Sequence, residues 1–204
     1  MRTELGWSPV SRISGLAFDR AIAPYQEQGL AKLKALAESL PPADWSQVQI
    51  SVEELEPMVI AVTAGRAGPG PAAAAAALAE AYERVGEFLS RSRIAPAGAP
   101  VAITREWDPE DGWEFFAGIP IAEAPASRPD RESPVRIGQT PEGRSVVAVH
   151  FGPHAGLEAT YDAIAAYMAV HDLEAAGPRW EQYVNDPGTT PAGELITRVC
   201  VPVR

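Results

Sequence analysis

The sequence predicts an α+β fold made of two β-β-α-β-β units that are related by a pseudo-twofold. The first observation is an internal repeat, because residues 48–50 and 59–65 match residues 135–137 and 146–152 at one offset (135 − 48 = 146 − 59 = 87). The second is that each copy continues with a helical stretch, an Asp-Pro turn and a closing strand. Two units of this kind create a crevice between them, where a small molecule could bind.

Composition indicates a globular protein whose partner is neither nucleic acid nor a membrane. With 204 residues, of which 46% are hydrophobic, the chain can bury a core in one large domain or two small ones. A formal net charge of −10 opposes binding to phosphate backbones and to anionic lipids. The single cysteine, Cys200, allows no internal disulfide. Without a signal-peptide pattern or an apolar run of roughly 18 residues, we expect a cytoplasmic protein.

Residues 1–45 form an expected N-terminal extension that carries one amphipathic helix. Its helix is predicted over residues 25–40 and ends at Pro41-Pro42. The apolar stripe of this helix needs a partner. It could cover the open side of the domain or mediate formation of a homodimer, and both alternatives stay open. Four residues make up the stripe: Leu30, Leu33, Ala37 and Leu40.

The first repeat is expected at residues 46–121, within a domain that spans residues 46–204. Residues 48–65 predict two strands on either side of a Glu-Pro pair, the second strand being a continuous apolar run. An alanine-rich segment over residues 72–92 predicts a helix, since alanine is the best helix former. A hairpin is then expected from strands at residues 101–107 and 113–121.

A linker at residues 122–134, rich in proline, alanine and charge, is expected to separate the repeats. The second repeat, residues 135–204, follows the plan of the first. Apolar residues from Leu157 to Met168 keep the 3.6-residue period of an amphipathic helix. Strands are expected on both sides of this helix, at residues 135–139, 145–151, 180–184 and 195–203.

Glu181 and Tyr183 are the strongest candidates for a site on the residues alone. They lie two positions apart in a predicted strand, so their side chains emerge on the same face. Trp180 and Val184 alternate with them, which fits either a polar face in solvent or the polar floor of a pocket. An unpaired carboxylate in a buried position costs several kcal/mol, so its retention would favour a function.

Other reactive or aromatic residues give weaker indications. Tyr161 has the helical spacing typical of core packing, although it could also line a site. Trp107 and Trp113 flank a hairpin turn, and of the two we expect Trp113 to reach a cavity. Cys200 lies in an apolar strand and favours an inert buried thiol. The three histidines have no cysteine or carboxylate at ligand spacing, so we expect no metal and no other cofactor.

Four segments together resemble the GyrI-like small-molecule-binding domain, which also occurs as the effector-binding module of AraC- and MerR-type transcription regulators. The similarity extends over residues 48–203. The second-repeat motifs are specific because three of them follow one another in the right order. The segments that show the resemblance are Trp113 to Ile121, Phe151 to Tyr161, Trp180 to Pro187 and Glu194 to Val203.

This resemblance implies a concave sheet with helices behind it and a ligand cavity at the interface of the two units. Family members bind bulky, hydrophobic and often cationic compounds between aromatic walls and buried glutamates, and some resemble hydrolases that open cyclopropane rings in toxic natural products. Residues 18–38 are similar to the C-terminal helix of polyketide-cyclase-like (SRPBCC) domains. The sequence has no helix-turn-helix pattern, so the regulator role would lack its DNA-binding half.

Carried over to this chain, the resemblance implies a small-molecule-binding protein with Glu181 as the charge partner of the ligand. Trp113, Tyr161, Trp180 and Tyr183 would be aromatic walls, and Glu194 would lie at the rim. The alternative is a hydrolase in which Glu181 is the general acid/base and Tyr183 assists by donating a hydrogen bond. A third alternative, an acidic module that inhibits a protein partner, depends only on the net charge of −10.

Overall fold

The computed structural model describes residues 48–125 and 132–204, which belong to one compact unit, Trp45–Arg204. The helix expected at residues 25–40 lies outside the described residues, as do the similarity to polyketide-cyclase-like domains and residues 126–131 of the linker.

Both repeats have the predicted β-β-α-β-β order. The first contains β1 (Gln49–Leu55), β2 (Val59–Ala67), α2 (Pro71–Ser92), β3 (Val101–Asp108) and β4 (Gly112–Pro120). The second contains β5 (Val135–Gln139), β6 (Gly143–Phe151), α3 (Leu157–Val170), β7 (Trp180–Tyr183) and β8 (Ile196–Pro202). Two short 3₁₀ turns, η2 (His154–Gly156) and η3 (Ala192–Glu194), precede α3 and β8.

All eight strands join one antiparallel sheet in the order β1-β6-β8-β7-β3-β4-β2-β5. The first strand of each repeat pairs with the other repeat, because β1 pairs with β6 and β5 pairs with β2. The two halves of the sheet meet where β3 pairs with β7. The repeats are therefore interlocked, and the middle of the sheet contains one strand from each.

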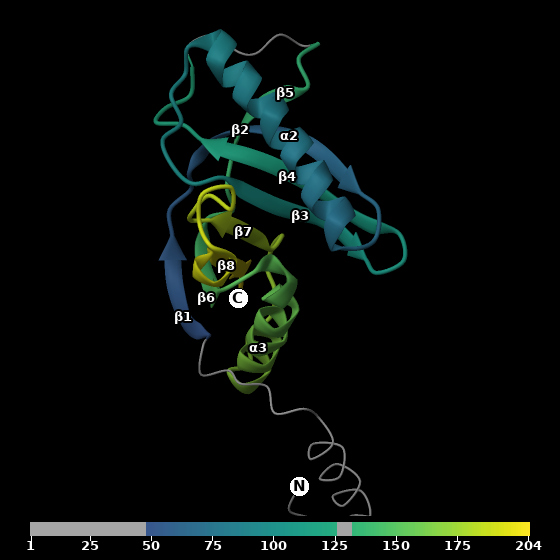
Figure 1. Ribbon diagram of the computed structural model, residues 1–204. Coiled ribbons are helices and arrows are strands. Elements are labelled where there is room, and N and C mark those ends of the chain that lie inside the picture. The colour runs from purple at the N-terminus through teal and green to yellow at the C-terminus, as the bar shows by residue number, and fades with distance from the viewer. Residues whose placement is uncertain (1–47, 126–131) are drawn as a thin grey trace, which may run out of the picture. The chain divides into compact units, whose positions relative to one another are not determined.

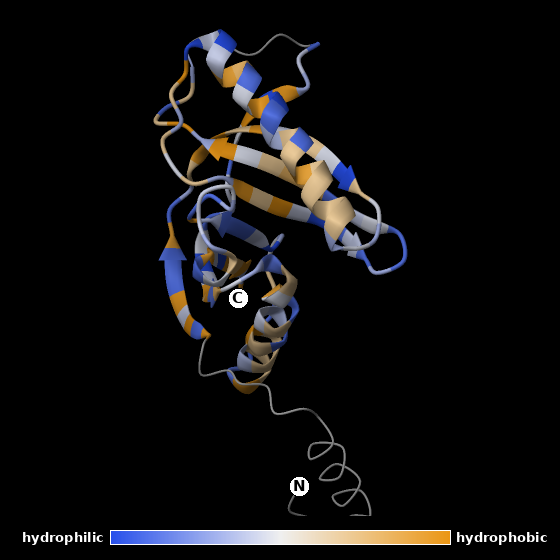
Figure 2. Ribbon diagram, in the orientation of Figure 1, coloured by the Kyte–Doolittle hydropathy of each residue, from blue (hydrophilic) through white to orange (hydrophobic). Residues whose placement is uncertain are grey.

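Both helices cover the same face of the sheet, each over one half (Figure 1). α2 buries Val85 and Leu89 against Ala61 and Val135, and α3 buries Ile164 in the other half. Hydrophilic and hydrophobic bands alternate along both helices (Figure 2), as expected for a helix with one face on a sheet. The central strands lie between the two areas that the helices cover.

The opposite face of the sheet is filled by its own apolar side chains. Ile60, Val101, Val147, Trp180 and Cys200 form a buried cluster there. Among residues 48–125 and 132–204, no helix is long and apolar enough to cross a bilayer.

Candidate functional site

Glu181 is a buried carboxylate at the middle of the sheet. It lies on β7, opposite Ala102 of β3 on one side and Val199 of β8 on the other. Both neighbours are apolar and fully buried, and Glu181 itself is only 8% exposed. The adjacent strands therefore give this carboxylate no polar side chain as a partner, and its hydrogen bonds come from elsewhere.

Two tyrosine hydroxyls donate hydrogen bonds to Glu181, one to each oxygen. Tyr161 on α3 donates to Oε1 at 2.6 Å, and Tyr183 on β7 donates to Oε2 at 2.7 Å. The bond from Tyr183 arises because residues two apart on a strand share a face. Bonds of this length to a carboxylate are charge-assisted, and they are about twice as strong as bonds between neutral groups. The carboxylate is thus held in one orientation.

Both donors keep their protons at neutral pH. Burial raises the pKa of Tyr161 and of Tyr183 well above the ordinary value of 10.0, and the negative charge of Glu181 raises each pKa further. The hydroxyls therefore act as hydrogen-bond donors and not as bases.

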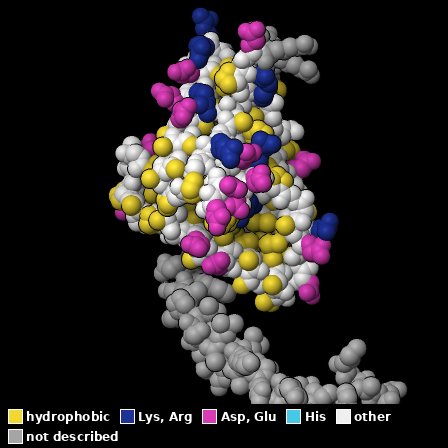
Figure 3. Space-filling view, turned by 90° about the vertical axis from the view of Figure 1, so that its right-hand side faces the viewer, with side chains coloured by type: hydrophobic (Ala, Val, Ile, Leu, Met, Phe, Trp, Pro, Cys, Tyr) yellow, Lys and Arg dark blue, Asp and Glu magenta, His cyan; other side chains and the backbone are white. Residues whose placement is uncertain are grey.

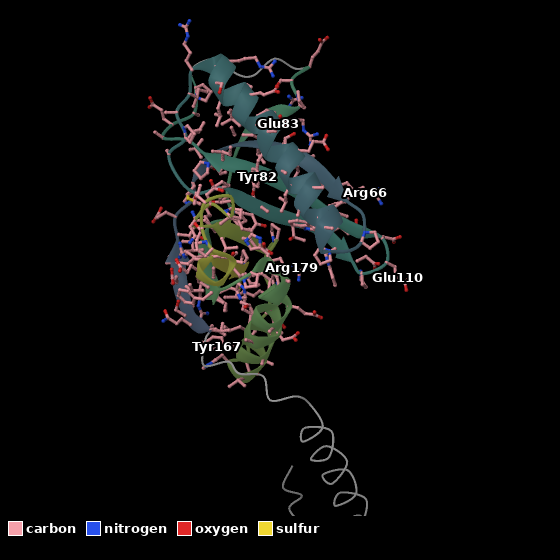
Figure 4. The ribbon with its side chains drawn as sticks, in the orientation of Figure 1. Arg66, Tyr82, Glu83, Glu110, Tyr167 and Arg179 are labelled. Atoms are coloured by element: carbon pink, nitrogen blue, oxygen red, sulfur yellow. The ribbon has the colours of Figure 1, made fainter. Side chains whose placement is uncertain are left out.

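Tyr82 of α2 brings a third phenol to the same place. Its ring meets that of Tyr183 edge to face, with the centroids 6.4 Å apart. Burial, followed by the charge of Glu181, raises the pKa of Tyr82. Within the described part of the chain its buried hydroxyl has no hydrogen-bond partner, which is unusual for a buried polar atom. Figure 4 shows Tyr82 on the helix that covers the first half of the sheet.

His154, in η2, also packs on Tyr183, with the ring centroids 5.1 Å apart. Burial lowers the pKa of His154, and the nearby charge of Glu181 opposes that change. Behind it, His150 is fixed by Thr160 Oγ1 at 2.8 Å and by the carbonyl oxygen of Pro153 at 3.1 Å. We call Glu181, Tyr82, Tyr161, Tyr183 and His154 the Glu181 site.

Glu181 takes part in none of the ion pairs formed by the described residues. The nearest basic residue in the sequence is Arg179, which directly precedes β7. The Arg179 guanidinium instead lies over two aromatic rings, 4.6 Å from the centroid of Tyr161 and 5.6 Å from that of Trp107. The buried negative charge is therefore solvated by phenols and has no paired cation.

The expected wall residues lie in different places. Trp180 precedes Glu181 on β7, so its side chain points to the opposite face and joins the buried cluster there. Trp180 is therefore not a wall of the Glu181 site. Trp113 is on the helix-covered face, where it stacks on Phe115 at 4.4 Å and donates from Nε1 to Thr104 Oγ1 at 3.2 Å.

Glu194 lies in η3, before β8 begins, and it is exposed. Its carbonyl oxygen accepts a hydrogen bond from Asn185, which fixes the turn.

Trp107 reaches the helix-covered face because of a β-bulge. The register of β3 on β4 shifts between Thr104 and Glu106, so Trp107 is directly opposite Trp113 and shares its face. Strict alternation from Ala102 and Thr104 would have sent Trp107 to the other face. No local pattern in the sequence indicates the bulge. Tyr82, His154 and Arg179 were also not predicted, although Tyr82 continues the apolar stripe of its helix.

Among the described residues, the possible metal ligands do not cluster and the single thiol is buried. No group of three histidine, cysteine or acidic side chains among them could hold a metal ion. Burial raises the pKa of the Cys200 thiol to about 12, so this cysteine stays protonated and unreactive.

Two surface hollows, of about 410 and 390 Å³, lie away from the Glu181 site. The larger one is bordered by β2, α2 and the β3–β4 hairpin, and its lining includes Arg66, Arg105 and Glu114. The smaller one lies between α2 and the residues that precede β5. Neither hollow is lined by Glu181 or by the three tyrosines.

A model of the GyrI-like small-molecule-binding domain matches residues 49–204, about three quarters of the chain. No curated protein matches the sequence. The matching region includes every residue of the Glu181 site.

Solved structures show the same fold at low identity. The C-terminal domain of EcmrR is 14% identical with a TM-score of 0.61, over 77% of this chain and 98% of that one. A hydrolase from Listeria innocua is 14% identical with a TM-score of 0.53, over 85% and 98%. SAV2435 bound to tetraphenylphosphonium is 11% identical with a TM-score of 0.50, over 76% and 94%.

Proposed function

Because the chain belongs to the family of GyrI-like small-molecule-binding domains, we propose that it binds a bulky, largely hydrophobic cation at Glu181. One observation carries the proposal: Glu181 is 8% exposed and accepts two phenol hydrogen bonds, yet it pairs with no cation of the described chain.

The physical reason is the cost of burying a charge. A carboxylate removed from water costs several kcal/mol unless it is paired or fully hydrogen-bonded. The hydroxyls of Tyr161 and Tyr183 offset part of this cost, and a ligand cation would offset more. The rings of Tyr82, Tyr161 and Tyr183 add attraction between a cation and an aromatic face. A hydrophobic cation also brings apolar surface that gains from burial beside these rings.

The ligand would enter between α2 and α3, the helices that carry Tyr82 and Tyr161. Because Glu181 is only 8% exposed, binding would require the tyrosines to move apart. The free energy needed for this movement is lower because the Tyr82 hydroxyl has no hydrogen bond that must be broken. The fold shared with SAV2435, whose structure contains tetraphenylphosphonium, supports a ligand of this chemical class.

Calorimetric titration with tetraphenylphosphonium tests the proposal directly. Glu181→Gln keeps the shape of the side chain and removes its charge, so we expect the affinity to fall at least about tenfold, or ~1.4 kcal/mol. Glu174→Gln is the matched control, since Glu174 is an exposed carboxylate paired with Arg204 at 2.7 Å. Equal affinity in wild type and Glu181→Gln, or no binding to the wild type, would contradict the proposal.

A hydrolase role is the second candidate, and the proton-donating groups around Glu181 favour it. Glu181 would accept a proton from water as general base and return it to the leaving group as general acid, while Tyr183 would assist by donating its hydrogen bond to the carboxylate. Incubation with cyclopropane-bearing natural products, followed by mass spectrometry, distinguishes the two roles. A hydrolase adds the mass of one water and loses this activity in Glu181→Gln, whereas a binding protein returns its ligand unchanged.

The acidic inhibitor role is not part of the proposal, because its only support was net charge. Acidic and basic side chains are interspersed over the face shown in Figure 3, so this face does not present charge of one sign. Ion pairs such as Arg84–Glu80 and Arg91–Glu87, both at 2.6 Å, neutralise part of the acidic surface of α2.

A further inference from the structure

Arg179 is a cation of the protein itself that lies on two aromatic rings next to the Glu181 site. Its Cζ is 4.6 Å from the ring centroid of Tyr161 and 5.6 Å from that of Trp107. Both distances are within the roughly 6 Å over which a ring face attracts a cation. We call Trp107 and Tyr161, the two rings that hold the guanidinium, the aromatic clamp.

Three separate elements build this arrangement. Trp107 comes from the β3–β4 hairpin, where the bulge turns it toward the helix-covered face. Tyr161 comes from α3, and Arg179 directly precedes β7. Positions 179 and 181 are two apart, so both side chains emerge on one face. Tyr161 joins the two, because its ring lies under Arg179 while its hydroxyl bonds Glu181.

Among residues 48–125 and 132–204, the Arg179 side chain takes part in no ion pair. Trp107 is 57% exposed, although tryptophan is a large apolar side chain. An exposed tryptophan that contacts one cation is a surface on which a second cation could stack.

We propose that the aromatic clamp is a cation-binding subsite, that Arg179 fills it in the free protein, and that it accepts a flat, delocalised cation of the guanidinium, amidinium or planar dye class when Arg179 moves away. In the ligand-binding role, which rests on the proposed function, the clamp would be the outer part of a site whose inner part is Glu181. Arg179 would then be a built-in competitor that sets which cations enter.

The preference for a flat cation follows from the distances. A guanidinium brings its charge within 4.6 Å of a ring centroid because no substituents project from its faces. An onium centre that carries four bulky groups keeps its charge further from the ring, so it gains less from the clamp. Arg179 also repels any cation that approaches Glu181, and this repulsion disappears when the arginine is replaced.

Filling the vacated clamp with methylguanidinium tests the subsite independently of Glu181. We expect methylguanidinium to bind Arg179→Ala, and an upfield ring-current shift of its methyl NMR signal would report this binding. It should not bind wild type. It should not bind the control variant Arg144→Ala either, in which an exposed arginine of β6 is removed. Adding Trp107→Leu should weaken this binding about fivefold, the roughly 1 kcal/mol of one such contact. Binding equal in wild type and Arg179→Ala, or unaffected by Trp107→Leu, would overturn the proposal.

A second titration tests the competitor role. Arg179→Met keeps the length of the side chain and removes its charge, so it should raise the affinity for a planar cationic dye such as ethidium by about fivefold or more. Its effect on tetraphenylphosphonium should be smaller. An unchanged or reduced affinity for the dye would refute the competitor role. If wild type and all variants bind no large cation, the ligand-binding role of Glu181 fails, while the methylguanidinium result still decides whether the clamp is a cation subsite.

Discussion

Replacing Tyr161 by phenylalanine removes one of the two hydroxyls that hold Glu181, and the cost to stability can be worked out from the structure. The lost bond is 2.6 Å long and ends on a carboxylate that is 8% exposed. A hydrogen bond to a charged group contributes about 1.5–3 kcal/mol, and the bared oxygen is left buried. We therefore expect the free energy of unfolding to fall by about 2–3 kcal/mol.

Urea unfolding followed by circular dichroism measures this change, and Tyr167→Phe provides the control. Tyr167 lies on the same helix, toward its other end (Figure 4), and stacks on His171 with the ring centroids 4.2 Å apart. Loss of its hydroxyl should change stability by at most about 0.5 kcal/mol, the usual range away from buried networks.

The charge of Glu181 can be isolated by repeating the experiment in Glu181→Gln. There the bond from Tyr161 is neutral, so its removal should cost only about 1 kcal/mol, and the coupling between the two positions should be about 1–2 kcal/mol. If Tyr161→Phe costs no more than Tyr167→Phe, or if its cost is the same in Glu181→Gln, the reasoning that this phenol stabilises a buried carboxylate is refuted.

Three further predictions concern packing, reactivity and pH. Gly65→Ala should destabilise the fold by about 1–3 kcal/mol in urea, because the new Cβ would lie 2.4 Å from the ring of Phe115. Gly86→Ala, in the middle of α2, should instead stabilise the fold by up to about 1 kcal/mol, because alanine favours a helix and the new Cβ would lie in open space. A loss of stability in Gly86→Ala, or no loss in Gly65→Ala, would contradict this reasoning. Cys200, whose pKa is raised to about 12, should react with a thiol reagent at pH 8 only after unfolding, and rapid labelling of the native protein would contradict its burial. The pKa of His154 is lowered on folding, so the unfolded chain binds its proton first; stability should decline as the pH falls below about 6.5, and less so in His154→Gln, while parallel pH profiles would exclude this contribution.

The sequence alone determined the features that depend on local order. The repeat at an offset of 87 residues predicted the β-β-α-β-β units, and the structure confirms their order and the α+β class. The alanine run predicted α2, since helix propensity acts within one segment. Strand alternation also placed Glu181 and Tyr183 on one face, as the bond between them confirms.

Only the tertiary structure decided which distant segments meet. The exchange of β1 and β5 between the halves of the sheet depends on pairing between strands far apart in the chain, which local periodicity does not encode. The bulge in β3 turned Trp107, and not only Trp113, to the helix-covered face. Tyr82 reaches Tyr183 and Tyr161 reaches Glu181 because two helices pack on opposite halves of one sheet. Such contacts follow from the packing of whole elements. The residue types therefore predicted that a site exists, but they did not predict which residues form it.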